Sequence, residues 1–372
     1  MCVEKQDNGL LYELALALAP GIGPRIAGEL LAHFGTAQEV MRATAKQLMC
    51  VPGMGAVRVK ALKHADLMRH AEKEMAFAAR HAIRCLFIGD HNYPSRLQHC
   101  SDAPLMLFYR GNADLNAAKI IAIVGTRKHT DYGEQLCTAL VEGLGSYGDA
   151  VVVSGLAYGI DAVAHKTCVG SGLPTVGVLA HGLDRIYPPA HRRLAREMLA
   201  GGGLLTEFPS GTGPDKVNFP VRNRIVAGMS DITVVVESGL KGGAVITAYL
   251  ASGYNREVAA FPGRVHDEAS RGCNMLIRAS VAAMITGAED LAALMGWTPP
   301  APRQAPPALQ ALTPEEQAIL QCLAGKDQVH ADTLLTGTSL DTTQLAAGLL
   351  RLELQGIIRA LPGRYYKIIP AG

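Results

Sequence analysis

The chain has 372 residues, a length typical of two or three domains. Its 35 Lys and Arg residues nearly balance 33 Asp and Glu residues, and the formal net charge of +2 argues against both a uniformly basic nucleic-acid-binding protein and an acidic disordered chain. With 49% hydrophobic but only 5% aromatic residues, including the single Trp297, the composition indicates a globular protein with a large core and argues against a carbohydrate or lipid cleft.

The cysteines and the apolar runs bear on metal binding and on the compartment. The eight cysteines are scattered, without a C-x-x-C pair or histidines at zinc spacing, so we expect buried thiols and no metal site. No secretory leader opens the sequence, and no apolar run approaches the roughly 18 residues that a membrane span needs. We therefore expect a cytoplasmic protein without a membrane span.

Residues 1–80 are predicted to form a small helical domain of the sterile-alpha-motif or helix-hairpin-helix type. Two similar turns, APGIG at 19–23 and VPGMG at 51–55, each precede an apolar helix that carries basic residues. Exposed amides at such turns can receive a phosphate. A role in helical packing alone is an equally good interpretation, because the net charge of this segment is small.

Residues 81–297 are predicted to form an α/β domain. The segment 83–112 has the features of a hairpin or edge strand. Continuous apolar strands separated by helices then predict a doubly wound, mostly parallel sheet with helices on both faces. The predicted strands are 119–124, 151–154, 175–179, 204–208, 232–237 and 258–261, and the predicted helices are 131–147, 159–171, 190–200, 221–228 and 243–253.

The last part of the chain is predicted to be a Pro-rich linker over 298–309 followed by a winged helix over 310–372. A cap and a proline at Thr313-Pro314 begin a helix, and two more helices and a hairpin ending at Tyr365-Tyr366 follow. This domain has five basic and six acidic residues. Its charge favours a protein-interaction or packing role, and contact between the wing and DNA is the alternative.

Two loops at the carboxyl ends of predicted strands have the composition of phosphate-binding loops. They are GTRKHTDYG at 125–133 and SGLAYGID at 154–161. Small residues there allow backbone amides to approach an anion at a helix start. The predicted phosphate-loop residues are Gly125, Thr126, Ser154, Gly155 and Gly159, and Arg127 and Lys128 add positive charge.

The usual nucleotide-binding and catalytic motifs are absent from these loops. Neither loop matches G-x-x-x-x-G-K-[ST] or G-x-G-x-x-G, which argues against a P-loop nucleotidase and a dehydrogenase. Ser154, Asp161 and His165 have the residue types of a catalytic triad, but no G-x-S-x-G elbow surrounds the serine. We therefore expect no catalytic residues, no cofactor and no metal.

Two further stretches place cations near the same sheet edge. The segment 206–228 interleaves basic residues with Phe219 and Asn223, and ESGLKGGA at 237–244 is a second Gly-rich loop. The cations of this edge are Arg127, Lys128, Lys166, Lys216, Arg222, Arg224 and Lys241. A row of cations and amides suits a chain of phosphates, and a base stacked on Phe219 would add roughly 1–3 kcal/mol. Alternatively, some arginines pair with acidic residues to hold the loops, above all Arg224 with Glu207.

Several of these stretches together closely resemble the DNA-processing protein A (DprA/Smf) family. They are GTRKHTDYG at 125–133, SGLAYGID at 154–161 with His165, GLDRIYP at 182–188, FPVRNRI at 219–225, and PG at 262–263 followed by GCNMLI at 272–277. The resemblance covers about residues 83–290. It implies an extended Rossmann-like domain that dimerises and binds single-stranded DNA. It also implies protection of incoming strands in natural transformation and loading of RecA onto them, including strands coated by single-strand-binding protein.

The resemblance also implies which residues would contact DNA. Carried over by position, the DNA pocket consists of Gly125, Arg127, Lys166, Lys216, Phe219, Arg222, Asn223 and Lys241, and Lys128, Arg224, Gly242 and Gly243 complete the predicted interface. The KGGA sequence at 241–244 departs from the family's commoner S-G-[ST], so the resemblance does not assign side-chain hydroxyl contacts to that loop. The helix 273–280 is a candidate dimer surface.

Two other classes of function stay open at this stage. One is a Rossmann-like nucleotide-binding hydrolase or sensor, which the lack of a clear acid/base pair argues against. The other is a scaffold without any ligand. Single-strand binding through five or six phosphates predicts a slope of about −4 in log affinity against log salt concentration.

Overall fold

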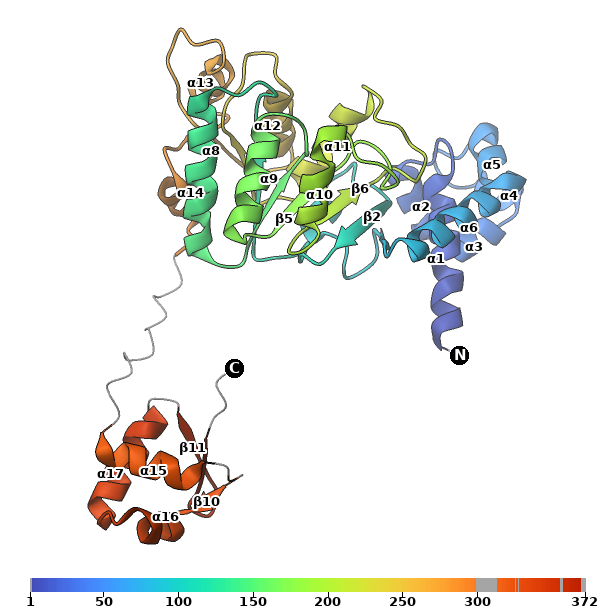
Figure 1. Cartoon of the computed structure of the whole chain (residues 1–372). Coiled ribbons are helices and arrows are strands. Elements are labelled where there is room, and N and C mark those ends of the chain that lie inside the picture. The colour runs from blue at the N-terminus through green and yellow to red at the C-terminus, as the bar shows by residue number, and fades with distance from the viewer. Residues whose placement is uncertain (1, 299–312, 325, 327, 355–356, 369–372) are drawn as a thin grey trace. The chain divides into compact units, whose positions relative to one another are not determined.

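The computed structural model describes residues 2–298, 313–324, 326, 328–354 and 357–368, and side chains from Gly9 onward. Contacts divide the chain into two units, Met1–Thr298 and Pro299–Gly372. Apart from Thr298, the predicted linker 298–309 lies outside the described residues. Figure 1 shows both units.

The first unit is all helical up to Arg80. Leu14, Leu30, Leu48 and Leu62 are fully or almost fully buried in its core. Arg58 donates from Nε to the Gly21 carbonyl at 3.0 Å and from a guanidinium NH2 group to the Gly53 carbonyl at 2.6 Å, which ties the two predicted turns together. The helices are α1 (Cys2–Leu18), α2 (Pro24–Phe34), α3 (Ala37–Arg42), α4 (Ala45–Leu48), α5 (Ala56–Leu62) and α6 (Ala65–Arg80).

A nine-stranded sheet follows, with the order β1-β2-β6-β5-β4-β3-β7-β8-β9. Strands β1 and β2 pair antiparallel, β2 also runs antiparallel to β6, and the remaining pairs are parallel. The strands are β1 (Arg84–Phe87), β2 (Met106–Gly111), β3 (Lys119–Val124), β4 (Ala150–Ser154), β5 (Thr175–Val178), β6 (Gly203–Thr206), β7 (Ile232–Val235), β8 (Glu257–Ala260) and β9 (Ala283–Met284).

Helices cover both faces of the sheet, as predicted (Figure 1). Alternate residues of β3 belong to opposite layers: Ile121 and Ile123 pack with α8, α9 and α14, whereas Ile120 and Ala122 pack with α11, α12 and α13. The helices are α7 (Ser95–Gln98), α8 (Asp131–Leu144), α9 (Ile160–Ser171), α10 (Arg192–Met198), α11 (Asn218–Gly228), α12 (Gly243–Gly253), α13 (Arg271–Arg278) and α14 (Ala288–Met295), with 3₁₀ turns at Gly145–Tyr147 and Pro189–His191.

The strand order creates a switch point beside β3. Strands β4, β5 and β6 continue the sheet on one side of β3, and β7 lies on its other side. The loops that follow β3 and β7 therefore lead to helices on opposite faces and leave a crevice between them. In open α/β sheets a ligand binds in such a crevice, at the carboxyl ends of the strands.

The sequence predictions for this unit are confirmed in outline and corrected in detail. The hairpin or edge strand expected in 83–112 is the β1–β2 pair. Strands β6 and β7 end at Thr206 and Val235, two residues before their predicted ends, and α11 begins at Asn218 rather than at 221 because Pro220 is tolerated in a first helical turn. Cys100, Cys137, Cys168 and Cys273 are buried as expected, but Cys50 is exposed.

The second unit has the order of a winged helix, as predicted. Its helices are α15 (Pro314–Leu323), α16 (Ala331–Thr338) and α17 (Thr342–Leu354), and its strands β10 (Val329–His330), β11 (Ile358–Leu361) and β12 (Tyr365–Ile368) form an antiparallel sheet of order β10-β12-β11. A capping box between Thr313 and Glu316 begins α15. Ile319, Leu334 and Leu352 are fully buried in the core.

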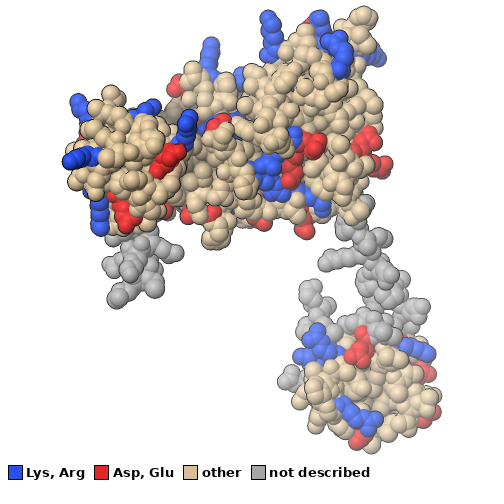
Figure 2. Space-filling view, turned by 180° about the vertical axis from the view of Figure 1, so that it is seen from behind, with Lys and Arg blue, Asp and Glu red and all other residues tan. Residues whose placement is uncertain are grey.

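The surface charge of the first unit is mixed, as the small net charge of the chain leads one to expect. On the face shown in Figure 2, basic and acidic side chains are interspersed over the first unit and form no large area of one sign. Within the described part of the chain, no helix is long and apolar enough to cross a membrane.

Candidate nucleic-acid interface

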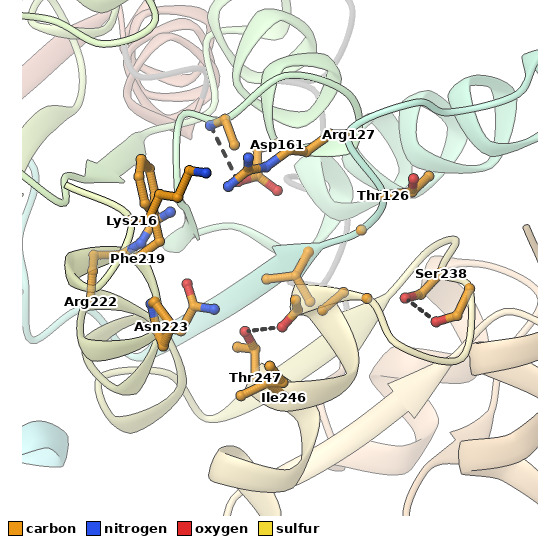
Figure 3. A pocket seen from close by; sticks show the side chains of 18 of the residues that line it. Thr126, Arg127, Asp161, Lys216, Phe219, Arg222, Asn223, Ser238, Ile246 and Thr247 are labelled. Atoms are coloured by element: carbon orange, nitrogen blue, oxygen red, sulfur yellow. Dashed lines mark hydrogen bonds between the residues drawn. The ribbon is translucent and has the colours of Figure 1, made fainter. Parts of the chain in front are cut away.

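A pocket of about 660 Å³ lies at the switch point, open to solvent rather than enclosed. Five segments line it: Gly125–Arg127 after β3, Ala157 and Asp161 after β4, Tyr187 after β5, the stretch from Pro214 to Asn223, and the stretch from Ser238 to Thr247. In Figure 3, Lys216, Phe219, Arg222 and Asn223 lie on one side of the pocket and Ser238 on the other. Each segment follows the carboxyl end of a parallel strand, so the topology alone brings them together.

The loop after β3 is fixed by the loop after β7. The buried Glu237 carboxylate accepts hydrogen bonds from the Thr130 amide at 2.9 Å and from the Thr130 hydroxyl at 2.6 Å. The Glu237 carbonyl accepts a bond from the Thr126 amide at 2.7 Å. Thr130 in turn accepts a bond from the Gly133 amide and caps α8. The polar groups of Glu237 and Thr130 therefore hold the two loops together.

Glycines allow the loops after β3 and β4 to pack against each other. Gly159 has φ +81°, and a Cβ atom there would overlap the Thr126 carbonyl and the Arg127 backbone. A Cβ atom on Gly125 would overlap the Ile160 side chain, and one on Gly155 would overlap the Arg222 guanidinium. Gly159 is needed because of close backbone approach, and Gly125 and Gly155 are needed because buried side chains pack against them.

Arg127 and Phe219 lie against each other in the pocket wall. The Arg127 guanidinium carbon lies 5.2 Å from the centre of the Phe219 ring, within the range of a cation–π contact. The ring of Tyr187 lies 6.1 Å from that of Phe219. Arg127 is exposed and Phe219 is half-buried, so a ligand can reach both a cation and an aromatic face.

Arg222 forms the floor of the pocket. It is 4% exposed and donates a hydrogen bond to the Val178 carbonyl. Burial lowers its pKa to about 10 against the opposing effect of Asp161, and burial raises the pKa of Asp161 although Arg222 opposes that shift. The two buried charges compensate each other in part. Arg222 thus lines the pocket in which it was predicted, but its guanidinium lies against Gly155 and donates to Val178, so its direct contact with DNA stays a prediction.

The predicted DNA-binding residues separate into three groups. Those in the pocket wall are Gly125, Thr126, Arg127, Lys216, Phe219, Arg222, Asn223, Gly242 and Gly243. Lys128, Lys166 and Lys241 are exposed but lie outside that wall. Ser154, Gly155, Gly159 and Arg224 have other surroundings, described next.

Ser154 and Arg224 correct the sequence prediction. Ser154 is fully buried, and its hydroxyl donates to the Ile123 carbonyl at 2.6 Å, so it cannot reach a ligand. Arg224 forms a largely buried ion pair with Glu207 and donates to the Asp102 carbonyl. The ion pair considered from the sequence is therefore confirmed. Gly155 lines an adjoining cavity of about 30 Å³ that shares Arg127 and Phe219 with the main pocket, and Gly159 lies beneath the loop after β3.

Eleven residues of the pocket wall were not predicted site residues, and they include Ile246, Thr247 and Tyr187, which lie outside the predicted Gly-rich and basic loops. Ile246 and Thr247 belong to α12, and Tyr187 precedes Pro188 in a segment far from any predicted strand end. The segment 243–253 is apolar on all sides, so its sequence gives no sign that Ile246 is 48% exposed. The signal for Tyr187 was its place in the motif at 182–188.

Ser154, Asp161 and His165 do not form a catalytic triad. His165 is fully buried, and its Nδ1 lies 2.7 Å from the Thr175 hydroxyl, which itself donates to the Val152 carbonyl. His165 therefore donates from Nδ1, and burial lowers its pKa to about 3. Among the residues that the structure describes, no group of three or more His, Cys, Asp or Glu side chains could hold a metal ion.

Comparison with protein families gives a match to each part of the chain. The model for DNA recombination-mediator protein A matches residues 84–296. The model for a SAM-like helix-hairpin-helix tandem matches residues 13–65, and that for the DprA winged helix domain matches residues 303–364. The family model that contains the pocket thus covers more than half of the chain.

Individual relatives agree with these matches. The DNA processing protein DprA of Bacillus subtilis is 40% identical over 210 residues, which are 56% of this chain and 70% of the relative. The X-ray structure of DprA from Streptococcus pneumoniae matches with a TM-score of 0.63 and 29% identity, over 77% of this chain and 98% of that one. A structure describing the single-stranded DNA binding mode of DprA from Helicobacter pylori matches with a TM-score of 0.52 and 28% identity, over 58% and 97%.

Proposed function

Since the chain belongs to the DNA recombination-mediator protein A (DprA/Smf) family, we propose that its pocket binds single-stranded DNA without sequence preference. The observation that carries the proposal is the pairing of an exposed cation, Arg127, with an accessible aromatic ring, Phe219, in a pocket open to solvent. The cation suits a phosphate, and every base presents a face that can stack on the ring. The Helicobacter pylori relative, described as binding single-stranded DNA, supports the proposal.

The positions of the outer cations favour a polymer over a single nucleotide. The pocket volume of about 660 Å³ suits either ligand. Lys128 and Lys241 are exposed directly beside wall residues, and Lys166 is exposed on α9. A mononucleotide bound in the pocket would leave these cations unused, whereas a longer strand can run past them.

We propose further that the protein does not transform its ligand, protects incoming strands in natural transformation, and acts as a homodimer that loads RecA onto them, with or without single-strand-binding protein. The competing function is a nucleotide hydrolase or sensor. Glu237, the carboxylate of the Gly-rich loop, is 2% exposed and already accepts two hydrogen bonds from Thr130. It is therefore poorly placed to act as a general base.

Titration of labelled oligo-dT and of mixed-sequence oligonucleotides at several salt concentrations tests the binding proposal. We expect similar affinities for all sequences and a slope of about −4 in log affinity against log salt. A flat salt dependence would remove the proposal. Incubation with nucleoside monophosphates tests the hydrolase, because release of free base with enzyme-like turnover would replace our assignment.

Two separate measurements test the finer parts of the proposal. Sedimentation equilibrium should give twice the chain mass if the protein is a homodimer. RecA ATPase activity on DNA coated by single-strand-binding protein should rise when the protein is added. Unchanged RecA ATPase activity in that assay would contradict RecA loading, but it would not contradict the binding of single-stranded DNA.

A further inference from the structure

The N-terminal helices contain a buried acidic side chain, Glu74, whose hydrogen-bond partner lies outside these helices. The inner face of α6 repeats as Leu67, Ala71, Glu74 and Ala78, at helical spacing, and all four residues are buried. Glu74 is 6% exposed. A carboxylate in an otherwise apolar stripe is unfavourable unless partners compensate for its lost hydration.

The partner of Glu74 is a single residue of the loop that leads into the pocket. The Ser210 amide donates to the Glu74 carboxylate oxygens at 2.9 Å and 3.1 Å, and the Ser210 hydroxyl donates at 2.5 Å. Glu74 takes part in none of the ion pairs within residues 2–298. The N-terminal helices thus hold the loop through three charge-assisted hydrogen bonds.

Ser210 lies in the connection between β6 and α11, residues 207–217. Beyond Ser210 the chain continues to Pro214 and Lys216 in the pocket wall and then to Phe219 on α11. Gly211 has φ +85°, and Gly213 follows two residues later, so this stretch has little stiffness of its own. Its conformation depends on its anchors.

The other anchors tie the loop to the α/β domain: Glu207 pairs with Arg224, and the Asn218 side-chain amide donates to the Gly213 carbonyl at 3.2 Å. The Gly211 amide donates to the Asp184 carboxylate at 3.1 Å, and the Gly182 amide donates to the Thr212 carbonyl at 3.1 Å. Both involve the segment after β5, whereas Glu74 alone joins the loop to the N-terminal helices by side-chain hydrogen bonds within the described residues.

We propose that Glu74 is a positioning residue for single-strand binding: through Ser210 it orders the loop that carries Lys216, so the N-terminal helices determine how well the pocket is preorganised. This inference rests on the proposed function. A released loop must be ordered when single-stranded DNA binds, and the lost conformational entropy weakens binding. We expect Glu74→Gln to weaken oligo-dT binding about tenfold, because it removes the charge and one acceptor.

The sign of the effect separates positioning from simple electrostatics. Removing a negative charge from a protein that binds a polyanion strengthens binding if charge alone matters. Glu72→Gln is the matched control, because Glu72 is exposed on the same helix and the change in net charge is identical. We expect Glu72→Gln to bind as tightly as the unmodified protein or slightly more tightly, and Glu74→Gln to bind more weakly.

A second variant tests the route through the loop. Ser210→Ala removes the hydroxyl that donates to the Glu74 carboxylate and leaves the sequence of α6 unchanged. It is therefore informative even if Glu74→Gln fails to fold. In a double-mutant cycle we expect the combined variant to bind no more weakly than Glu74→Gln alone. Hydrogen exchange of residues 207–217 should speed up in both single variants and slow down again when oligo-dT is bound.

The outcomes distinguish this proposal from the proposed function. If the unmodified protein does not bind oligo-dT, the proposed function fails. If it binds, but Glu74→Gln and Ser210→Ala bind equally well and show unchanged exchange in the loop, strand binding stands and the positioning role of Glu74 is wrong.

Discussion

Arg127 and Arg222 line the same pocket, but their surroundings give them different tasks. Arg127 is exposed and lies over the Phe219 ring, whereas Arg222 is buried over Gly155 and near Asp161. A solvated guanidinium can exchange water for phosphate at little expense, but a buried one must first break its bonds within the protein. The two arginines should therefore differ in how their variants respond to salt.

Arg127→Ala is expected to weaken binding of all single-stranded sequences alike. Loss of one phosphate contact should reduce the magnitude of the log-affinity slope against log salt by about 0.7. Arg193→Ala is the control, since the Arg193 side chain is 91% exposed on α10 and lies outside the pocket wall. Weaker binding of one sequence only would indicate base readout instead.

Arg222→Lys is expected to lower stability and to leave the salt slope unchanged. Lysine keeps the charge but cannot reproduce the planar guanidinium on Gly155 and its bond to the Val178 carbonyl. Urea unfolding should show a loss of about 2 kcal/mol, typical of a hydrogen bond from a charged group. Unchanged stability together with clearly weaker oligo-dT binding would restore Arg222 as a direct DNA ligand.

His165 makes the stability depend on pH. Its folded-state pKa, lowered to about 3, lies below the ordinary value of 6.5, so the unfolded chain takes up a proton that the folded chain does not. The stabilising effect is complete above about pH 6.5 and falls by about 1.4 kcal/mol for each pH unit between 6.5 and 3.

His165→Gln should therefore flatten the pH dependence of the unfolding free energy in the acid range. Glutamine can keep a donor toward Thr175 but does not titrate. Urea denaturation at a series of pH values from neutral to mildly acidic checks this. Parallel curves for the variant and the unmodified protein would show that His165 already takes up its proton when folded.

At the scale of elements, the loops meet through backbone contacts that glycine permits. Gly159, the N-cap of α9, has a positive φ and lies against the Thr126–Arg127 backbone, so any Cβ atom there would move the segment that carries Arg127. Gly170, on the same helix, has no atom within 4 Å of a built Cβ. The two glycines provide a matched pair.

Gly159→Ala is expected to destabilise the protein by about 1–3 kcal/mol and to weaken oligo-dT binding, because it strains the backbone and displaces Arg127. Gly170→Ala should instead stabilise it by about 0.5–1 kcal/mol with unchanged binding, since alanine favours a helix interior. Thermal unfolding and DNA titration of both variants test this. Equal effects of both substitutions would contradict the close contact at Gly159.

Periodicity and turn chemistry were sufficient to predict most elements of the fold. Strand β3 and helix α12 have the bounds expected from the sequence, because their apolar runs end at glycines or charges. Strand β9 has only two residues and therefore no detectable period. The edge position of the β1–β2 pair beside β6 depends on long-range pairing that no local pattern records.

The candidate site was predictable only as a collection of loops. Residues that follow strand ends, such as Gly125, Arg127 and Gly243, are in the pocket wall because topology brings strand ends together. The sequence could not separate Arg127 from Arg222, or exclude Ser154, because burial depends on packing between layers. The sequence also could not show that Glu74 contacts Ser210, because the two residues are 136 positions apart along the chain.

At the scale of the whole molecule, the candidate interface belongs to one unit. Every residue of the pocket wall lies between Val124 and Thr247, within Met1–Thr298. The winged helix, within Pro299–Gly372, has its own core. Removing the winged helix should therefore leave the binding of single-stranded DNA by the pocket unchanged.

A fragment ending at Thr298 is expected to keep the oligo-dT affinity of the full chain within about twofold, because it retains the entire pocket wall. Fluorescence anisotropy of both proteins at one salt concentration measures this, and circular dichroism verifies that the fragment is folded. A loss of tenfold or more in a folded fragment would mean that the C-terminal unit contributes directly to strand binding.

The open mouth of the pocket has a consequence for the kind of DNA that can enter. A tunnel would have to be threaded from a terminus, but a crevice accepts a segment from the side. Covalently closed circles should therefore compete with linear strands equally well, nucleotide for nucleotide. Gaps and loops deep inside a long molecule would be as accessible to this protein as a freshly cut end.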